Sequence, residues 1–237
     1  METKDGVVML VGLAQNAANG LRRLWQAVKC TRQLGVTIRV RILENGSTDR
    51  TVDVLHEWKA SDPNMNYQCL DIRLPQSREI RLGTLRNRLW TESQYDPDWD
   101  TLMMVDCDLK RYWSPEVLKD LLADPSWTVL TAYGSCPLYS YSDIYAYRTA
   151  AYPNGPLQVS DYWRRQVPAQ RRSPPHDQRR ESVLSAFGWL GLYRRGPYMR
   201  RALYGLNGDC EHVGLHADIR KQGITILTEP RLKVMHP

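Results

Sequence analysis

The chain contains little phenylalanine and no long apolar run. Phe187 is the only phenylalanine in 237 residues. Near the start of the chain, the apolar stretch covers only residues 7–11 and follows a polar N-terminus. A membrane-spanning helix needs about 20 apolar residues, and a signal peptide needs a basic start before its apolar core. We therefore expect no membrane span and a cytoplasmic location, unless the chain is one domain of a larger or membrane-anchored protein.

Cysteine is sparse and shows no spacing typical of a metal or redox site. Its number is odd, and no two cysteines form a CxxC pair: Cys30, Cys69, Cys107, Cys136 and Cys210. This pattern favours free thiols in a reducing compartment over a disulfide framework or a zinc site.

The sequence also has no lysine-rich tract and no internal repeat. Its composition, with 42% hydrophobic and 24% charged residues, is typical of a soluble globular protein. The net charge of +6 favours an anionic partner. Because the cations are dispersed along the chain, we expect that partner not to be nucleic acid.

Strands and helices alternate through the first 135 residues. Apolar and β-branched runs predict strands at residues 6–14, 37–43, 66–74, 100–109 and 127–132. Helical spacing predicts helices at residues 21–34, from Ser47 or Thr48 to 59, at 79–90, and after Ser114. This order predicts an α/β fold with a mostly parallel sheet between helices.

The second half of the sequence is less regular. Residues 139–152 are rich in Tyr, Ser and Ala, and residues 166–180 are rich in Arg and Pro, which is typical of a mobile loop. Regular patterns return at 182–193, in a helix at 213–221 and in two strands at 224–228 and 232–235. We expect one domain, 1–237, with a nucleotide-binding half (1–135) and an acceptor-binding half (136–237).

Two acids separated by one residue end the most apolar strand. Asp106 and Asp108 follow the run Leu102–Val105. Ligands of open α/β sheets bind at this carboxyl end, and carboxylates at i and i+2 of a strand point the same way. Together they are suited to one hard cation with open positions for diphosphate oxygens. The alternative is an ordinary strand-end turn, in which Asp is common.

Several motifs in this order resemble nucleotide-sugar glycosyltransferases of the GT-A fold, broadly of family 2. They are the loop at 13–16, the run ENGSTDRT at 44–51, the Arg-Asn pair at 86–87, the Asp-x-Asp strand, and the acidic motif DCEH at 209–212 followed by the final His236. Residues 81–89, 218–223 and 230–234 more narrowly resemble fungal capsule-associated mannosyltransferases.

The resemblance implies a Rossmann-like sheet and a metal-dependent transfer of a sugar from a nucleoside diphosphate to a glycan or glycoprotein acceptor. Asp106, Asp108 and His236 would hold the metal. Oxygen and nitrogen ligands suit Mn²⁺, with Mg²⁺ as the alternative. The donor would be a UDP- or GDP-sugar, contacted by Leu13, Ala14, Gln15, Glu44, Asn45, Arg86, Asp106 and Cys107.

The resemblance implies that a residue near 209–212 acts as the catalytic base of an inverting enzyme. Family 2 enzymes usually supply it from a Glu-Asp pair, but here Glu211 is followed by His212. Glu211 and Asp209 are therefore the candidates, with His212 as a third, and an ordinary acidic helix start is the alternative. The anomeric outcome stays open, because the capsule enzymes point to retention. We expect the acceptor to contact residues 139–180, and Trp189 to stack on a sugar.

Two other functions compete with this hypothesis. A sugar nucleotidyltransferase uses a similar sheet, but usually has a glycine-rich basic signature near the first strand, which residues 14–20 do not show. A non-catalytic nucleotide- or carbohydrate-binding module would agree with the positive charge, but would not need the two acids together with Arg86.

Overall fold

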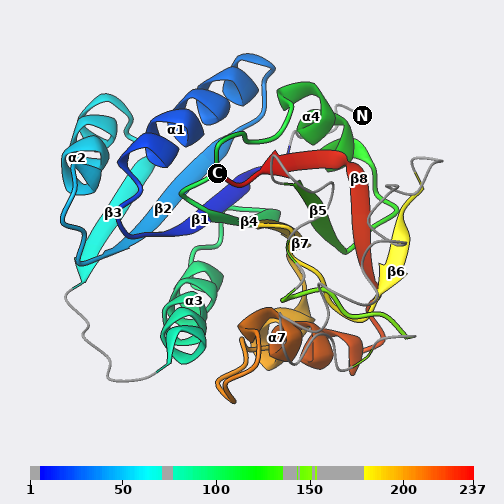
Figure 1. The fold of residues 1–237 in the computed structure, drawn as a ribbon. Coiled ribbons are helices and arrows are strands. Elements are labelled where there is room, and N and C mark those ends of the chain that lie inside the picture. The colour runs from blue at the N-terminus through cyan, green and yellow to red at the C-terminus, as the bar shows by residue number, and fades with distance from the viewer. Residues whose placement is uncertain (1–5, 71–76, 136–142, 144, 151–152, 154–178) are drawn as a thin grey trace.

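An eight-stranded sheet runs through the computed structural model, which describes residues 6–70, 77–135, 143, 145–150, 153 and 179–237. The strand order is β3-β2-β1-β4-β7-β5-β8-β6 (Figure 1). The strands are β1 (Val8–Ala14), β2 (Ile38–Asn45), β3 (Met65–Leu70), β4 (Thr101–Asp106), β5 (Val129–Ser135), β6 (Glu181–Val183), β7 (Leu190–Arg194) and β8 (Ile226–Met235). The predicted mixed α/β fold with a mostly parallel sheet is confirmed.

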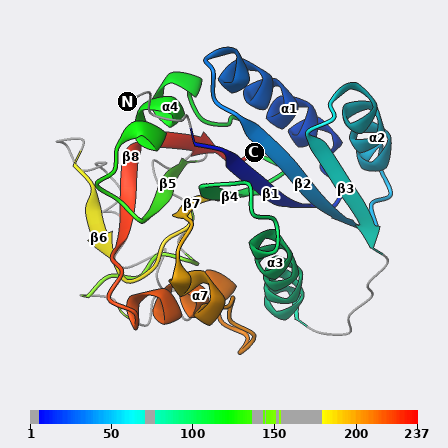
Figure 2. The ribbon, with the colours of Figure 1, turned by 180° about the vertical axis from the view of Figure 1, so that it is seen from behind.

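Helices cover both faces of this sheet. One face carries α1 (Ala18–Gln33), α2 (Thr51–Ser61) and α4 (Pro115–Ala123). The other carries α3 (Arg78–Gln94), the 3₁₀ helix η1 (Pro197–Arg201) and α7 (Glu211–Arg220). Figures 1 and 2 show the two layers from opposite sides. None of the described helices is long and apolar enough to cross a membrane.

The central strand β4 is buried on both faces, as its apolar run predicted. Met103 and Val105 pack into the core under α1, whereas Leu102 and Met104 pack into the core over α3 and α7. Burial of a side chain of this size contributes roughly 1.5–3 kcal/mol to stability. β4 is therefore a rigid base for the acids that follow it.

Three expectations about local structure need correction or lie partly outside the described residues. Neither Ser47 nor Thr48 caps α2, which begins at Thr51 after an N-cap without a side-chain hydrogen bond. The two C-terminal strands are one strand, β8, whose register against β5 shifts between Ala132 and Tyr133. The third strand ends at Leu70, so its predicted continuation to residue 74 lies outside the described residues. The same is true of residues 166–178 of the loop expected at 166–180 and of most of the acceptor segment at 139–180.

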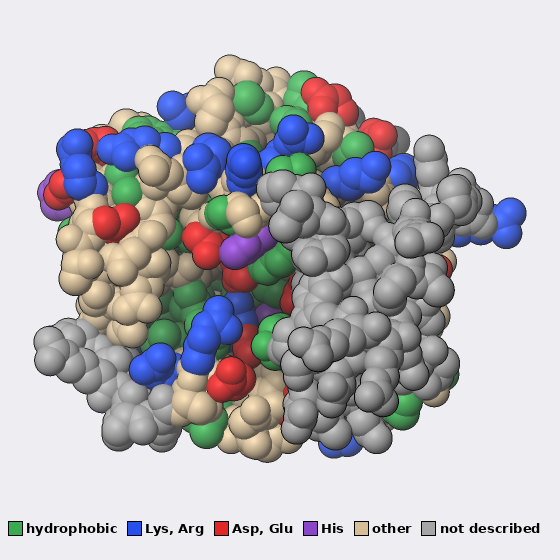
Figure 3. Space-filling view, in the orientation of Figure 1, with side chains coloured by type: hydrophobic (Ala, Val, Ile, Leu, Met, Phe, Trp, Pro, Cys, Tyr) green, Lys and Arg blue, Asp and Glu red, His purple; other side chains and the backbone are tan. Residues whose placement is uncertain are grey.

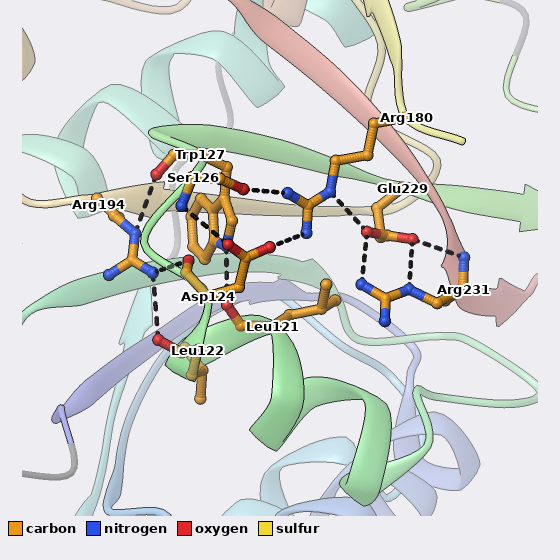
Figure 4. A network of polar contacts seen from close by, with 9 residues as sticks. All are labelled: Leu121, Leu122, Asp124, Ser126, Trp127, Arg180, Arg194, Glu229 and Arg231. Atoms are coloured by element: carbon orange, nitrogen blue, oxygen red, sulfur yellow. Dashed lines mark hydrogen bonds and ion pairs between the residues drawn. The ribbon is translucent and has the colours of Figure 1, made fainter. Parts of the chain in front are cut away.

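An ion cluster around Glu229 stabilises β8 at its register shift against β5. This carboxylate is 1% exposed and accepts hydrogen bonds from the backbone N–H and guanidinium of Arg231 and from Arg180 Nε at 2.8 Å (Figure 4). Arg180 also donates to Asp124 Oδ2 at 2.6 Å. Burial raises the pKa of Glu229, but the hydrogen bonds from Arg231 and Arg180 outweigh it, so that the pKa lies below its ordinary value.

Replacing Glu229 by Gln is expected to lower the free energy of unfolding by about 2 kcal/mol at pH 7, because two guanidinium groups lose a charged acceptor. Since the folded-state pKa is depressed, this stabilisation is present above pH 4.5 and is lost as pH falls through the folded value. Urea unfolding of both proteins from pH 7 to 3 measures it. A difference that does not shrink with acid would contradict the ion-pair explanation.

Four of the five cysteines lie among the described residues, and all four are free thiols: Cys30, Cys69, Cys107 and Cys210. The prediction of free thiols is confirmed for these four. Cys136 lies outside the described residues.

Candidate active site

A pocket of about 320 Å³ opens where β1, β2 and β4 end. This volume lies within the range of small-molecule sites. Among its lining residues are most of the predicted nucleotide and metal contacts: Leu13, Ala14, Gln15, Asn45, Arg86, Asp106, Cys107 and Asp108. Figure 3 shows the hollow on the face that Figure 1 presents, with acidic, basic and histidine side chains around it. The structure therefore brings these predicted residues to one place.

Close packing of α1 places its first turn against the acids. A Cβ atom on Gly20 would lie 2.1 Å from the carbonyl oxygen of Cys107 and 2.6 Å from the Cα of Asp108. Only glycine permits that approach. The Gln15–Gly20 segment, which sequence patterns showed only as a polar break, thus forms one wall of the site.

The two loops predicted to meet the nucleoside are bound to each other. Gln15 Nε2 donates to the carbonyl oxygen of Asn45 at 2.9 Å, and Asn16 exchanges hydrogen bonds with Ser47 and Thr48. Glu44 is 3% exposed and accepts from the Ser47 N–H at 2.5 Å. Glu44 therefore holds the turn instead of lining the pocket, and its contact with a nucleoside stays a prediction.

Asp108 lies beside His236, as the metal-site hypothesis requires. His236 Nε2 is 3.6 Å from Asp108 Oδ2, although the two residues are far apart in sequence. The interaction with His236 lowers the pKa of Asp108, and the interaction with Asp108 raises the pKa of His236. Both side chains are substantially exposed, at 52% and 38%. The pair is therefore accessible from the pocket mouth.

Trp189 occupies a special position beside this pair. Its indole stacks on the His236 ring with centroids 5.1 Å apart, and its carbonyl accepts from the Asp106 N–H at 3.0 Å. Its φ of 63° is unusual for a bulky residue. Backbone strain of this kind is often found at functional sites. Trp189 thus packs on the candidate metal ligand, and its stacking on a sugar stays a prediction.

Arg86 is buried between two carboxylates. It is 4% exposed, donates to Asp106 Oδ1 at 2.6 Å and forms an ion pair with Glu211. Burial lowers its pKa, but the charge of Asp106 outweighs this and raises it. Arg86 lines the pocket as predicted, but its guanidinium already neutralises two acids of the protein.

Two further arginines line the same pocket one and two turns earlier in α3. Arg78 and Arg81 are both exposed, and the charge of Arg78 lowers the pKa of Asp108. Arg78 was missed from the sequence, where the Arg-Asn pair drew attention to Arg86. The signal was available, because residues 78, 81, 82 and 85 share one helical face.

The candidate bases occupy different environments. Glu211 lies beside Arg86 with its side chain 6% exposed, whereas Asp209 is 44% exposed and 3.1 Å from Arg148 Nη2. His212 is 2% exposed and stacks on Phe187 at 3.7 Å. Burial and the charge of Arg86 lower its pKa well below the ordinary value, so its ring is neutral.

A further acid near the site was not predicted. Asp143 accepts from the Gly188 N–H at 2.8 Å, which places it beside the Gly188-Trp189 turn. Burial raises its pKa to about 6, and the charge of Asp106 acts in the same direction. Its position depends on a long-range contact with Gly188, so sequence spacing gave no signal for it.

Comparison with known proteins identifies the fold of the chain. No family model and no curated protein sequence matches the chain. Several solved structures are similar. A mannosyltransferase from Pyrobaculum calidifontis in complex with GDP-Man and Mn²⁺ matches with a TM-score of 0.61 and 12% identity, over 99% of this chain and 57% of that chain. S. aureus TarS residues 1–349 matches with a TM-score of 0.58 and 12% identity, over 97% of this chain and 60% of that chain, and GalNAc-T7 with UDP, GalNAc and Mn²⁺ matches with a TM-score of 0.59 and 13% identity, over 99% of this chain and 44% of that chain.

The fold is GT-A. The chain spans about half of the length of these proteins. At 12–13% identity the likeness shows the GT-A fold alone. The narrower likeness to capsule-associated mannosyltransferases stays a hypothesis.

The GT-A site offers ligands of the right type for a divalent cation. Asp106 and Asp108 supply carboxylate oxygens and His236 an imidazole nitrogen, a mixed set that suits Mn²⁺. In the described part of the chain, no three His, Cys, Asp or Glu side chains are close enough to hold a metal by themselves. Asp106 faces Arg86, while Asp108 and His236 face each other. The donor atoms therefore suit a divalent cation in type, and its binding by these residues stays a prediction.

Proposed function

We propose that the chain is a glycosyltransferase domain that transfers a sugar from a nucleoside diphosphate donor to a glycan or glycoprotein acceptor. The observation that supports this most directly is the pocket in which the pair Asp106 and Asp108 is opposed by Arg78 and Arg81. A binding module for neutral sugars needs neither set, whereas a bound cation and cationic side chains both stabilise the charge of a departing diphosphate.

Residues in and beside the pocket would have distinct roles in this reaction. Asp106, Asp108 and His236 would hold a divalent cation, which when bound supplies Lewis-acid stabilisation of the departing diphosphate. Arg78 and Arg81 would donate to phosphate oxygens, which guanidinium groups match in geometry. The segment Leu13–Gln15 and Asn45 would position the nucleoside.

Deprotonation of the acceptor hydroxyl falls to a carboxylate. Glu211 is paired with Arg86, which lines the pocket, while Asp209 is the more exposed of the two candidates. We retain both, since exposure favours Asp209 and proximity to Asp106 favours Glu211. Both remain available for an inverting reaction, in which one carboxylate accepts the proton.

A thermal-shift screen with UDP-, GDP- and dTDP-sugars tests the proposal. At a ligand concentration one hundred times Kd, binding stabilises the native state by about 2.7 kcal/mol and raises Tm by roughly 5–10 °C. We expect that shift with one nucleotide class in the presence of Mn²⁺, together with release of its nucleoside diphosphate. No shift with any donor would reject the proposal.

The double variant Arg78→Gln/Arg81→Gln is expected to weaken binding of the nucleoside diphosphate at least about tenfold, because each arginine contributes a charge-assisted hydrogen bond. Binding of the nucleoside without phosphates should change little. Arg88→Gln is the matched control, since Arg88 lies on the same helix but bonds to Glu92 and Gln68. Calorimetric titration of all three proteins measures the effect, and equal losses in the control would refute the assignment.

A further inference from the structure

Four cationic side chains lie together on the surface next to Asp108 and His236. They come from three separate parts of the chain and are all exposed. We call them the basic strip: Arg23, Lys110, Arg111 and Lys233. Figure 3 shows Lys and Arg side chains in a band across this face, beside the acidic and histidine side chains at the hollow.

Hydrogen bonds fix the first part of the basic strip. Arg23 Nε donates to the carbonyl oxygen of Leu109 at 3.0 Å, which brings α1 against the segment after Asp108. Lys110 N–H donates to the carbonyl oxygen of Met235 at 2.8 Å, which brings the same segment against the end of β8. The strip is therefore built by tertiary contacts, which the dispersed cations of the sequence did not reveal.

The pairing of the end of β8 with Arg111 orients the side chains of Arg111 and Lys233, the other part of the basic strip. Arg111 forms an antiparallel bridge with Met235, and side chains of paired residues lie on the same face of a sheet. Lys233 precedes Met235 by two residues in β8, so it points to that face as well. Arg111 and Lys233 thus project from one side of the strand, next to the C-terminal His236.

The charge of the basic strip is not neutralised locally. None of its members forms an ion pair with an acid within the described segments of the chain. The neighbouring Arg231 differs, since it is paired with Glu229. Clustered cations without partners raise the local concentration of anions. The strip is therefore suited to an anionic ligand.

The position of the basic strip distinguishes that ligand from the donor. The donor pocket is lined by β1, β2, α3 and the acids, and no strip residue lines it. The strip instead belongs to the segments that follow Asp108 and precede His236. These segments adjoin Asp108 and His236, the residues that would hold the metal, so an acceptor bound to the strip would lie beside the proposed reaction centre.

We propose that the basic strip binds an acceptor that carries phosphate or carboxylate groups. This inference rests on the proposed glycosyltransferase function and names the chemical class of its acceptor. Several charged groups along an acceptor chain would contact Arg23, Lys110, Arg111 and Lys233 in turn. A neutral acceptor would form no ion pair with the basic strip.

Two other polyanions suit the strip less well. Surfaces that bind a membrane usually add exposed apolar or aromatic side chains to their cations, and single-stranded nucleic acid is usually stacked on aromatic rings. The large hydrophobic side chains exposed in the described structure are Tyr95, Tyr145, Leu203 and Leu206. None of these belongs to α1, to β8 or to the segment after Asp108.

The test compares the variant Lys110→Gln/Arg111→Gln/Lys233→Gln with Lys59→Gln/Arg200→Gln/Arg201→Gln, which removes the same charge from exposed positions of α2 and η1. Probes are polygalacturonate, inorganic polyphosphate, neutral dextran, a single-stranded oligonucleotide and vesicles containing anionic lipid. We expect the unmodified protein to bind polygalacturonate or polyphosphate but not dextran. The strip variant should bind about tenfold more weakly, and the control variant should bind normally.

The proposal would be overturned by unchanged binding by the strip variant, by equal loss in both variants, or by tighter binding of the oligonucleotide or vesicles than of either charged polymer. The Mn²⁺-dependent nucleotide shift is measured on the same proteins. If that shift persists while charged polymers do not bind, only the acceptor assignment fails. If the unmodified protein shows no nucleotide shift, the proposed function fails, whatever the polymers do.

Discussion

Replacing Asp108 by Asn is expected to lower kcat for sugar transfer about 1000-fold, the size of loss seen when a preorganised charge-stabilising group is removed from an active site. The amide keeps the size of the side chain but loses the negative charge that a divalent cation needs. Asp108 follows β4, faces His236 and lines the pocket. Its side chain is 52% exposed, so the free energy of unfolding should change by less than about 1 kcal/mol.

The decisive readouts are the initial rate of nucleoside diphosphate release and the Mn²⁺-dependent rise in Tm with nucleotide. Both should be lost in Asp108→Asn and kept in Asp120→Asn, a control on the exposed side of α4. If Asp108→Asn retains the Mn²⁺-dependent shift, Asp108 is not a metal ligand. If the control loses activity as well, the effect is one of net charge.

The parts of the site that sequence patterns located are those encoded locally. Burial of β4 on both faces leaves an unmistakable apolar run, and its end marks Asp106 and Asp108. Alternation of strands and helices likewise encodes a parallel sheet, whose carboxyl ends gather the loops at 13–17 and 44–51. Because these relations follow from strand direction alone, the position of the pocket was predictable.

The parts that sequence patterns missed depend on long-range pairing. β7 lies between β4 and β5 and is antiparallel to both, although it follows them by more than fifty residues in sequence. Nothing in Leu190–Arg194 specifies those neighbours. The same holds for Asp143 against Gly188 and for the register shift of β8, which Glu229 stabilises from inside the strand.

Arg86 also has features of both kinds: its place in the helix is encoded locally, whereas its partners depend on long-range contacts. Its type and its place in α3 favoured a diphosphate ligand, because exposed arginines at a pocket bind phosphate. The structure gives it two carboxylate partners from distant elements, Asp106 of β4 and Glu211 of α7. The periodicity of the sequence does not reveal such partners, and binding of a diphosphate by Arg86 stays a prediction.

Replacing Arg86 by Met should therefore destabilise the protein by about 3–5 kcal/mol, because it leaves the buried carboxylate of Glu211 unpaired and removes the partner of the partly exposed Asp106. Urea unfolding at pH 7 measures this loss. Arg88→Met is the matched control on the same helix: its pair with Glu92 is partly exposed, so that variant should lose less than about 1 kcal/mol.

A second substitution separates the structural role of Arg86 from ligand binding. In Arg86→Met/Glu211→Met, the buried charge on α7 is removed together with its partner, so part of the lost stability should return, since apolar replacement of a buried pair is often close to neutral. Restoration by Glu211→Met would show that the cost arises from the unpaired carboxylate. If Arg86→Met instead unfolds like the unmodified protein but no longer binds nucleoside diphosphate, Arg86 is the phosphate ligand, and the proposed role of Arg78 and Arg81 passes to it.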